Sequence, residues 1–265
     1  MKQIRPFFEK KGITEVGAIS FESALPLLDC RAKGSIPKNA KSVIVSAFPY
    51  EVNEQKERNI SFYASVPDYH NVVKAYLDEI IKELSEKFSF NFVAFVDNSP
   101  IREVDAGVKA GIGVKGKNSL LINKKYGSFV FLGTIVTDME LKVTEKKDKT
   151  CLNCDFCKKA CPSGCISDGG VKENLCLSKI TQKKGELSEE EKALVKENSL
   201  LWGCDVCQTV CPMNKKREKT PIKEFNLSGK TFLNKEDLTK EEIKDKPYGF
   251  RGEKPLLRNY EILYK

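Results

Sequence analysis

Apolar and polar residues in the first half of the chain follow two periods, which predict strands and helices in turn. The run Ser42–Phe48 is apolar and β-branched and stops at Pro49, the pattern of a buried strand. Between Asn71 and Phe88 the apolar residues share one helical face, and Lys, Asp and Glu occupy the other. A second strand is expected over Phe92–Val96, before the strand-breaking sequence Asp97-Asn-Ser-Pro100. The first half therefore predicts an α/β or α+β domain.

Further local signals complete the expected elements. Ser99-Pro100 places a proline at the first position of another helix. Leu120–Asn123 and Ser128–Val136 are expected to be two more strands, on either side of a short turn that contains glycine. Towards the other end, Ser188-Glu-Glu-Glu191 has the pattern of a capping box, which predicts a helix that runs to about Asn198.

The composition changes along the chain and suggests three parts. Up to residue 147 there is a single cysteine, Cys30, and Lys142–Thr150 is a charged linker that ends where the cysteine-rich part begins. After Asn214 the chain becomes polar and rich in Lys and Glu. These shifts predict a catalytic domain, a double-cluster domain and a C-terminal extension that packs on the core, over residues 1–147, 148–218 and 219–265.

The cysteine spacing is the strongest chemical signal. The run Cys151-x2-Cys154-x2-Cys157-x3-Cys161-Pro162 is the ligand pattern of two-cluster bacterial ferredoxins. In those proteins three cysteines hold one [4Fe–4S] cluster and the fourth reaches across to the other. A second array, Cys204-x2-Cys207-x3-Cys211-Pro212, has Leu201 where a standard repeat would carry a further cysteine. The spacing therefore predicts two [4Fe–4S] clusters, with one ligand to be found elsewhere.

Crosswise sharing divides these ligands between the clusters. One cluster takes Cys151, Cys154, Cys157 and Cys211, and the other takes Cys161, Cys204, Cys207 and a fourth thiolate. Cys165 and Cys176 are the two candidates for that fourth position. Cys165 follows so soon after Cys161 that both fall on one turn, so Cys176 is the predicted ligand. Structural zinc does not need the compact run that ends in proline, and disulfides need an oxidising compartment, of which the sequence gives no sign.

The overall composition says more about where in the cell the protein is expected than about the reaction it performs. With 40% hydrophobic residues the chain can build a core, but its longest largely apolar stretch, Phe129–Val136, is far shorter than the roughly 18 residues that a membrane span requires. The N-terminal residues include neither an apolar export segment nor a twin arginine, so a cytoplasmic protein without a membrane partner is expected. The formal charge of +8 falls to about +4 when two clusters of about −2 each are counted, which is compatible with RNA.

Two polar residues of the first part are candidates for chemistry, because clusters fused to another domain usually supply electrons to a cofactor or substrate held there. Asp97 follows a strand that is expected to be buried, so its carboxyl group would face a pocket and could donate a proton near neutral pH. The alternative is an aspartate that only shapes the turn. His70, the single histidine, is either a donor to a ligand or an ordinary residue at the start of a helix.

Several segments together resemble a known family. Val96-Asp-Asn-Ser-Pro100 is similar to a V-D-x-x-P motif, and Ala110–Asn123, with its closely spaced glycines, is similar to A-G-x-G-x-x-G-K-N-x-L-x-I. Tyr126–Gly133 continues the similarity, and Asn174–Thr181 and Gly203–Asn214 resemble second-cluster segments. These motifs resemble those of the epoxyqueuosine reductases, the cobalamin- and iron–sulfur-dependent enzymes of queuosine-tRNA biosynthesis. The resemblance also supports Cys176 over Cys165.

The resemblance implies a fold and a reaction. A nitroreductase-like N-terminal domain would hold cobalamin in its base-off form, and a ferredoxin-like domain would reduce it one electron at a time. A low-potential donor such as ferredoxin or flavodoxin would supply those electrons. The reduced cobalt would deoxygenate an epoxide on a tRNA wobble base, with Asp97 as the proton donor to the departing oxygen. The implied cofactor-binding residues are Arg31, Tyr63, His70, Asp97, Lys117, Asn118 and Ser119.

The sequence departs from the family pattern at two places. Val66 and Pro67 replace the expected Gly and Arg in the segment before His70. Longer members continue into a helical-repeat domain that helps to hold tRNA, about where this chain ends at Lys265. The substrate is therefore expected to be a tRNA held by other surfaces or a free modified nucleoside. Two other readings compete: a different corrinoid iron–sulfur reductase that resembles reductive dehalogenases, and a non-catalytic ferredoxin-type electron carrier.

Overall fold

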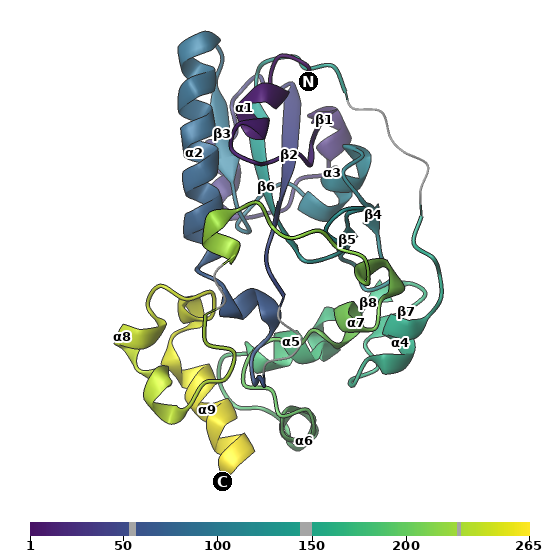
Figure 1. Ribbon diagram of the computed structural model, residues 1–265, viewed down its shortest axis with the longest axis vertical. Coiled ribbons are helices and arrows are strands. Elements are labelled where there is room, and N and C mark those ends of the chain that lie inside the picture. The colour runs from purple at the N-terminus through teal and green to yellow at the C-terminus, as the bar shows by residue number, and fades with distance from the viewer. Residues whose placement is uncertain (53–56, 144–149, 227–228) are drawn as a thin grey trace.

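The computed structural model describes residues 1–52, 57–143, 150–226 and 229–265. It has an upper lobe built on a sheet and a lower lobe built of short helices, stacked along the longest axis (Figure 1). The upper lobe contains α1 (Arg5–Glu9), β1 (Val16–Ser20), β2 (Ser42–Pro49), α2 (Tyr69–Lys87), β3 (Phe92–Phe95), α3 (Glu103–Lys109), β4 (Val114–Lys115), β5 (Leu121–Ile122) and β6 (Val130–Thr137).

The sheet of the upper lobe has four strands in the order β1-β2-β6-β3, and every neighbouring pair is antiparallel. Strand β2 pairs with β6 along its whole length, from Ser42 opposite Thr137 to Pro49 opposite Val130. The antiparallel pairing makes this lobe an α+β fold. The expected strand over Ser42–Phe48 is confirmed, and the strand expected over Phe92–Val96 ends one residue earlier.

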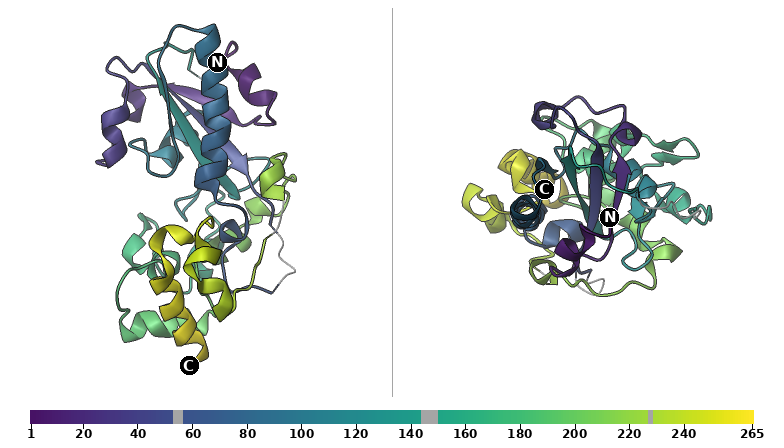
Figure 2. Two further views of the ribbon diagram at one scale, coloured as in Figure 1. Left: turned by 90° about the vertical axis from the view of Figure 1, so that its left-hand side faces the viewer. Right: turned by 90° about the horizontal axis from the view of Figure 1, so that it is seen from above.

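Alternate residues of β2 pack into two different cores, because successive side chains of a strand point to opposite faces of the sheet. Ile44 and Phe48 pack with the apolar face of α2, which covers one side of the sheet (Figure 2). Val43 and Val45 point to the other side, where they pack with α3 and the segment after it. Helix α2 lies very close to the sheet at Gly133, because a Cβ there would come within 2.9 Å of two of its side chains.

The lower lobe begins in the described segment that starts at Thr150, and the linker expected over Lys142–Thr150 lies largely outside the described residues. This lobe contains α4 (Phe156–Ala160), β7 (Ile166–Ser167), β8 (Gly170–Val171), α5 (Leu177–Thr181), α6 (Glu189–Glu197), α7 (Val206–Thr209), α8 (Lys240–Ile243) and α9 (Glu253–Tyr264). The capping box at Ser188 and Glu191 is present, so the expected start of α6 is confirmed. Helices α5, α6 and α9 share one small apolar core.

Two segments cross between the lobes. Asn59 and Ile60, which precede α2 in the chain, lie in the lower lobe, where Ile60 forms a bridge with Trp202 and Asn59 binds the backbone of Leu233. In the opposite direction, Ile222 and Phe225 pack into the core of the upper lobe. Each lobe therefore receives a segment of chain that packs into it from the other part of the sequence. The domain boundaries at residues 147 and 218 stay a prediction.

One expected helix is wrong. Ser99-Pro100 does not begin a helix, and α3 begins only at Glu103. The Ser99 hydroxyl instead accepts a hydrogen bond from the backbone N–H of Ile101 at 3.1 Å, which closes a local turn, and Ile101 is buried against the sheet. No helix in the described part of the chain has both the length and the apolar character that crossing a bilayer demands.

Candidate functional site

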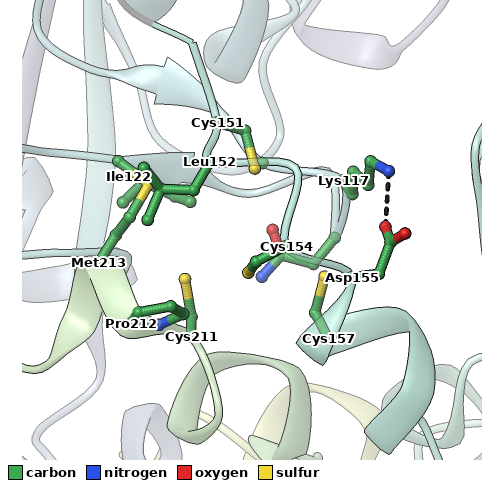
Figure 3. Close-up of a pocket in the computed structure, with 12 residues that line it drawn as sticks. Lys117, Ile122, Cys151, Leu152, Cys154, Asp155, Cys157, Cys211, Pro212 and Met213 are labelled. Carbon is green, nitrogen blue, oxygen red and sulfur yellow. Dashed lines mark hydrogen bonds and ion pairs between the residues drawn. The ribbon is translucent and has the colours of Figure 1, made fainter.

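The first group of thiols surrounds a small cavity. Cys151, Cys154 and Cys157 come from the loop before α4 and from α4 itself, and Cys211 comes from the segment after α7. All four line one enclosed space (Figure 3), together with residues of the glycine-rich stretch and the side chains of Leu152 and Met213. This is the predicted ligand set of the first cluster, and the structure brings it together.

The loop can wrap around this cavity because two of its residues adopt left-handed backbone conformations. Asn153 has φ 53° and Asp155 has φ 60°, and Asn and Asp tolerate this region better than other non-glycine residues. The carboxylate of Asp155 accepts a hydrogen bond from Lys117 Nζ at 2.6 Å, and Asp168 accepts one at 3.2 Å. Lys117 therefore ties the cysteine loop to the upper lobe (Figure 3).

The second group of thiols lies where α4, α5 and α7 meet. Cys161 ends α4, Cys176 precedes α5, and Cys204 and Cys207 lie before and within α7, which packs against α4. Burial raises the pKa of Cys204 to about 11, and the charges of Cys176 and Cys161 add to this shift. Burial also raises the pKa of Cys207 to about 12, with further contributions from Cys204 and Cys176. These four thiols therefore share one electrostatic environment.

Cys165 differs from this group in its contacts. Its side chain is only 2% exposed, and its sulfur lies 3.4 Å from the Cys161 sulfur. Ligand sulfurs of a cubane cluster bind different iron atoms and are held apart by the cluster, so two sulfurs in direct contact do not suit a pair of ligands. The contact supports Cys176 as the fourth ligand, as the spacing predicts.

The arrangement suits clusters better than single ions or disulfides. All ten cysteines are described and free. Within the described ranges no three His, Cys, Asp or Glu side chains converge closely enough to hold one metal ion, although four thiols line the cavity in Figure 3. Thiols that surround a space without meeting at a point fit an inorganic core of several atoms. Asn118 links the two groups, because it lines the first cavity and hydrogen-bonds to Cys207 of the second.

Asp97 occupies a sharp turn after β3. Its backbone is left-handed, with φ 58°, and the N–H of Ser99 donates to its carbonyl at 2.8 Å. The carboxylate contacts His70, whose Nε2 lies 3.2 Å from Oδ2 of Asp97. The side chain of Asp97 is 61% exposed. The expectation of a desolvated carboxyl facing a pocket is therefore wrong, because the turn after β3 leaves the side chain of Asp97 largely in solvent.

His70 is held between two carboxylates. Its Nδ1 lies 2.7 Å from Oδ1 of Asp68, and that same oxygen accepts the backbone N–H of His70 as the N-cap of α2. Burial lowers the pKa of His70, but the hydrogen bonds that its ring donates to the carboxylates of Asp68 and Asp97 outweigh burial and raise the pKa to about 9. The imidazole is therefore protonated at neutral pH and fixes the orientation of the Asp97 carboxylate.

Tyr63 connects this acid to the second thiol group. Its hydroxyl accepts hydrogen bonds from Nε1 of Trp202 at 2.9 Å and from Nε2 of Gln182 at 3.3 Å. The Tyr63 ring lies against Gly203, the residue before Cys204, where an added Cβ would come within 3.4 Å of the ring. Burial raises the pKa of Tyr63 strongly, and the charge of Asp97 contributes to the rise. Tyr63 therefore lies beside the segment that carries Cys204 and within reach of the charge of Asp97.

Comparison with known proteins gives two family matches. Residues 34–98 match the family described as Epoxyqueuosine reductase QueG, DUF1730, and residues 150–214 match the 4Fe-4S double cluster binding domain. The first match includes Tyr63, His70 and Asp97, and the second includes the eight predicted cluster ligands.

Curated relatives decide the family. An epoxyqueuosine reductase of Lactococcus garvieae is 32% identical over 246 residues, which cover 84% of this chain and 68% of the relative. One from Cyclobacterium marinum is 38% identical over 216 residues, covering 77% of this chain and 68% of the relative. The chain belongs to the epoxyqueuosine reductase family.

Solved structures of the family agree in fold. A crystal structure of epoxyqueuosine reductase with an epoxyqueuosine-modified tRNA-Tyr stem loop superposes with a TM-score of 0.82, at 25% identity, over 98% of this chain and 80% of that one. The enzyme from Streptococcus thermophilus gives a TM-score of 0.79 at the same identity and coverage. A catabolic reductive dehalogenase, NpRdhA, shares the fold at 15% identity with a TM-score of 0.51. The expected combination of an α+β lobe with a double-cluster domain is confirmed.

The remaining predicted cofactor-binding residues fall in two places. Arg31 lies exposed at the start of the turn Arg31–Ser35, and the preceding loop reaches the Asp97 turn through a 2.8 Å bond from Leu28 N–H to the carbonyl of Pro100. Lys117 and Asn118 contact the cysteine loops, as described above. Ser119 has φ 62° and lies near Gly170 of β8. Their role as corrinoid contacts stays a prediction.

Sequence reasoning missed several residues around Asp97. Asp68 both caps α2 and binds His70, and an aspartate directly before an amphipathic helix is a recognisable N-cap signal. Trp202 and Gln182 meet Tyr63 from distant parts of the chain, and no local pattern marks them. Glu103 is a fourth residue that sequence reasoning missed. In the described structure its Oε1 is fully enclosed without a hydrogen-bond partner, and Asp97 lies close enough for their charges to interact.

Glu103 makes a testable contribution to pH-dependent stability. Burial, with the charge of Asp97, raises the pKa of Glu103 well above its ordinary value of 4.5. The folded protein then holds this proton more tightly than the unfolded chain does. The contribution is present in full below about pH 4.5 and is lost as pH rises toward the folded pKa, by up to about 1.4 kcal/mol per pH unit.

We therefore expect Glu103→Gln to raise the Tm relative to the wild type increasingly from pH 5 to pH 8. The amide keeps the shape of the side chain and removes the ionisation. Glu86→Gln, an exposed position on the same lobe, is the matched control and should show no such trend. Parallel pH curves for Glu103→Gln and the wild type would mean that the carboxyl group is not protonated in the folded state.

Proposed function

We propose that this protein reduces epoxyqueuosine to queuosine in tRNA, using cobalamin bound between the lobes and two [4Fe–4S] clusters. The proposal rests on one observation above all. The carboxylate of Asp97 contacts His70, and its charge also acts on Tyr63, whose ring lies beside Gly203, the residue before the thiol of Cys204. Relatives named epoxyqueuosine reductase, and a family structure with an epoxyqueuosine-modified tRNA stem loop, support the choice of substrate.

The surroundings of Asp97 fit a large, flat and partly apolar ligand. Leu28, beside the Asp97 turn, and Phe250, whose ring lies 6.2 Å from that of His70, are large apolar side chains that are 37% and 55% exposed. These exposed apolar side chains would be suited to hold the apolar parts of a corrin ring. Arg251, the next residue, lines a cavity of about 230 Å³ with Gln182, and its Nε is buried without a partner among the described residues. That N–H is suited to a polar group on the edge of the macrocycle.

The reaction balances as the removal of one oxygen. An epoxide, two electrons and two protons give an alkene and one water molecule. When bound, cobalamin supplies a strongly reducing cobalt centre, and the clusters supply its electrons singly. The chain's own residues supply proton control. Asp97 in its carboxylic acid form would deliver a proton to the departing oxygen, and His70 would keep that carboxyl group directed at the oxygen.

The order of the electron relay follows from the contacts. The second thiol group is adjacent to Tyr63 and so lies nearer the acid, and Asn118 connects it to the first group. Electrons would therefore enter at Cys151, Cys154, Cys157 and Cys211 and leave from the second group. A low-potential protein donor, such as a ferredoxin or flavodoxin, is the proposed source.

The function can be tested with the reconstituted holoprotein. We expect protein loaded with both clusters and cobalamin, and supplied with dithionite, to convert epoxyqueuosine to queuosine in tRNA, as measured by mass spectrometry of digested nucleosides. The free nucleoside should be tested in parallel, because it separates chemistry from tRNA binding. A corrinoid spectrum without conversion of either substrate would contradict the assignment. Failure to bind cobalamin at all would favour the electron-carrier alternative.

A further inference from the structure

A groove with a volume of about 720 Å³ lies against the first thiol group. Its wall includes Leu152, Pro212 and Met213, which also line the cavity enclosed by the four thiols. Figure 3 shows Leu152 and Met213 side by side next to that cavity. A single layer of side chains therefore separates the groove from the predicted position of the first cluster.

The lining of this groove includes an exposed, large apolar side chain, Leu152. Leu152 is 61% exposed although it directly follows a cluster ligand, Cys151. A large apolar side chain in solvent beside a redox centre gains nothing for folding, whereas it would be covered by a docked partner. An apolar centre over a redox group suits a contact that excludes water while electrons pass.

The edge of the groove is basic. Lys124, Lys215 and Lys216 line it and are exposed. Among the described residues that line the groove, the single acidic one is Glu15, which lies 3.4 Å from Nζ of Lys125 and accepts a hydrogen bond from Asn123, so its charge is locally balanced. The groove therefore presents a net positive rim around an apolar centre, which complements an acidic protein surface.

We propose that this groove docks an acidic one-electron carrier protein, which delivers electrons to the cluster held by Cys151, Cys154, Cys157 and Cys211. The inference rests on the proposed function, because it assigns the entry point of its electrons. RNA is the less suitable occupant. The described lining residues include neither an arginine nor an aromatic ring, and these are the groups that stack on bases. A small, apolar-centred surface with a charged rim is typical of transient electron-transfer contacts.

The test measures cluster reduction in the holoprotein with both clusters and without tRNA. Reduced flavodoxin, an acidic carrier, is mixed rapidly with the protein, and the bleaching of cluster absorbance is followed. We expect Lys124→Glu/Lys215→Glu/Lys216→Glu to lower the second-order rate constant by about tenfold or more at low salt. The loss should shrink as salt is raised to about 0.5 M, because screening weakens the repulsion. Reduction by dithionite should be unchanged, because that small reductant needs no docking surface.

A matched control separates docking from total charge. Lys235→Glu/Lys240→Glu/Lys244→Glu makes the same charge change at exposed positions on and near α8, outside the groove, and should change the rate by no more than about twofold. Equal slowing in both triple variants, or none in either, would overturn the proposal. So would a groove variant that loses binding of the tRNA stem loop but keeps its reduction by flavodoxin. Because the readout is cluster reduction, a failure of the proposed enzyme activity would leave this result interpretable.

Discussion

Asp97→Asn is expected to lower turnover of epoxyqueuosine by about 10²–10⁴-fold while the protein keeps both clusters and its bound corrinoid. The amide has nearly the same shape, so the turn after β3 and the contact with His70 are retained. An amide cannot deliver a proton, so the oxygen released from the epoxide would have to take one from water. The measurement is single-turnover conversion with pre-reduced enzyme, which removes electron delivery from the observed rate.

Two controls make this result specific. Iron content and the corrinoid spectrum show whether the variant is correctly loaded. Asp105→Asn removes another carboxylate of the upper lobe, one paired with Lys115 on the surface, and should leave the rate unchanged. A rate for Asp97→Asn within a few-fold of the wild type would assign Asp97 to the turn alone, the alternative that its exposed position keeps open.

Local patterns predicted those parts of the fold that depend on neighbouring residues. Strand β2 and helix α2 were predictable because their apolar periods are set within one element. The false helix at Ser99-Pro100 shows the limit of such signals. Proline there satisfies the rule for a helix start, but the Ser99 hydroxyl makes a competing turn and Ile101 is drawn into the core. Burial of one side chain outweighed the local preference.

Contacts between distant segments could not be predicted. The insertion of Asn59 and Ile60 into the lower lobe, and of Phe225 into the upper one, depends on which surfaces meet after folding. The same is true of the hydrogen bonds from Trp202 and Gln182 to Tyr63. Cluster ligands were predictable because the run of cysteines is local. The electrostatic partners of Asp97 were not, since the resemblance indicated His70 as a cofactor-binding residue and not as a partner of Asp97.

The second large effect is expected from replacing the fourth ligand of the second cluster, which we predict to be Cys176 rather than Cys165. Cys176→Ser should lower the iron content from about eight to about four atoms per protein, because a serine hydroxyl does not replace a thiolate in this cluster. Loss of the second cluster interrupts the relay at the step nearest Tyr63, so turnover with a protein donor should be abolished. Iron analysis and the electron paramagnetic resonance spectrum of the reduced protein measure the two consequences separately.

Cys165→Ser is the informative counterpart, because the Cys165 sulfur lies 3.4 Å from that of Cys161, a contact that does not suit two ligands of one cluster. It should keep the full iron content, with at most a modest loss of stability from a hydroxyl placed at a site that is 2% exposed. Cys30→Ser, far from both groups in the sequence, should behave like the wild type. If Cys165→Ser loses half of the iron and Cys176→Ser keeps it, the second cluster is held by Cys165, and the sulfur contact with Cys161 must open when the cluster assembles.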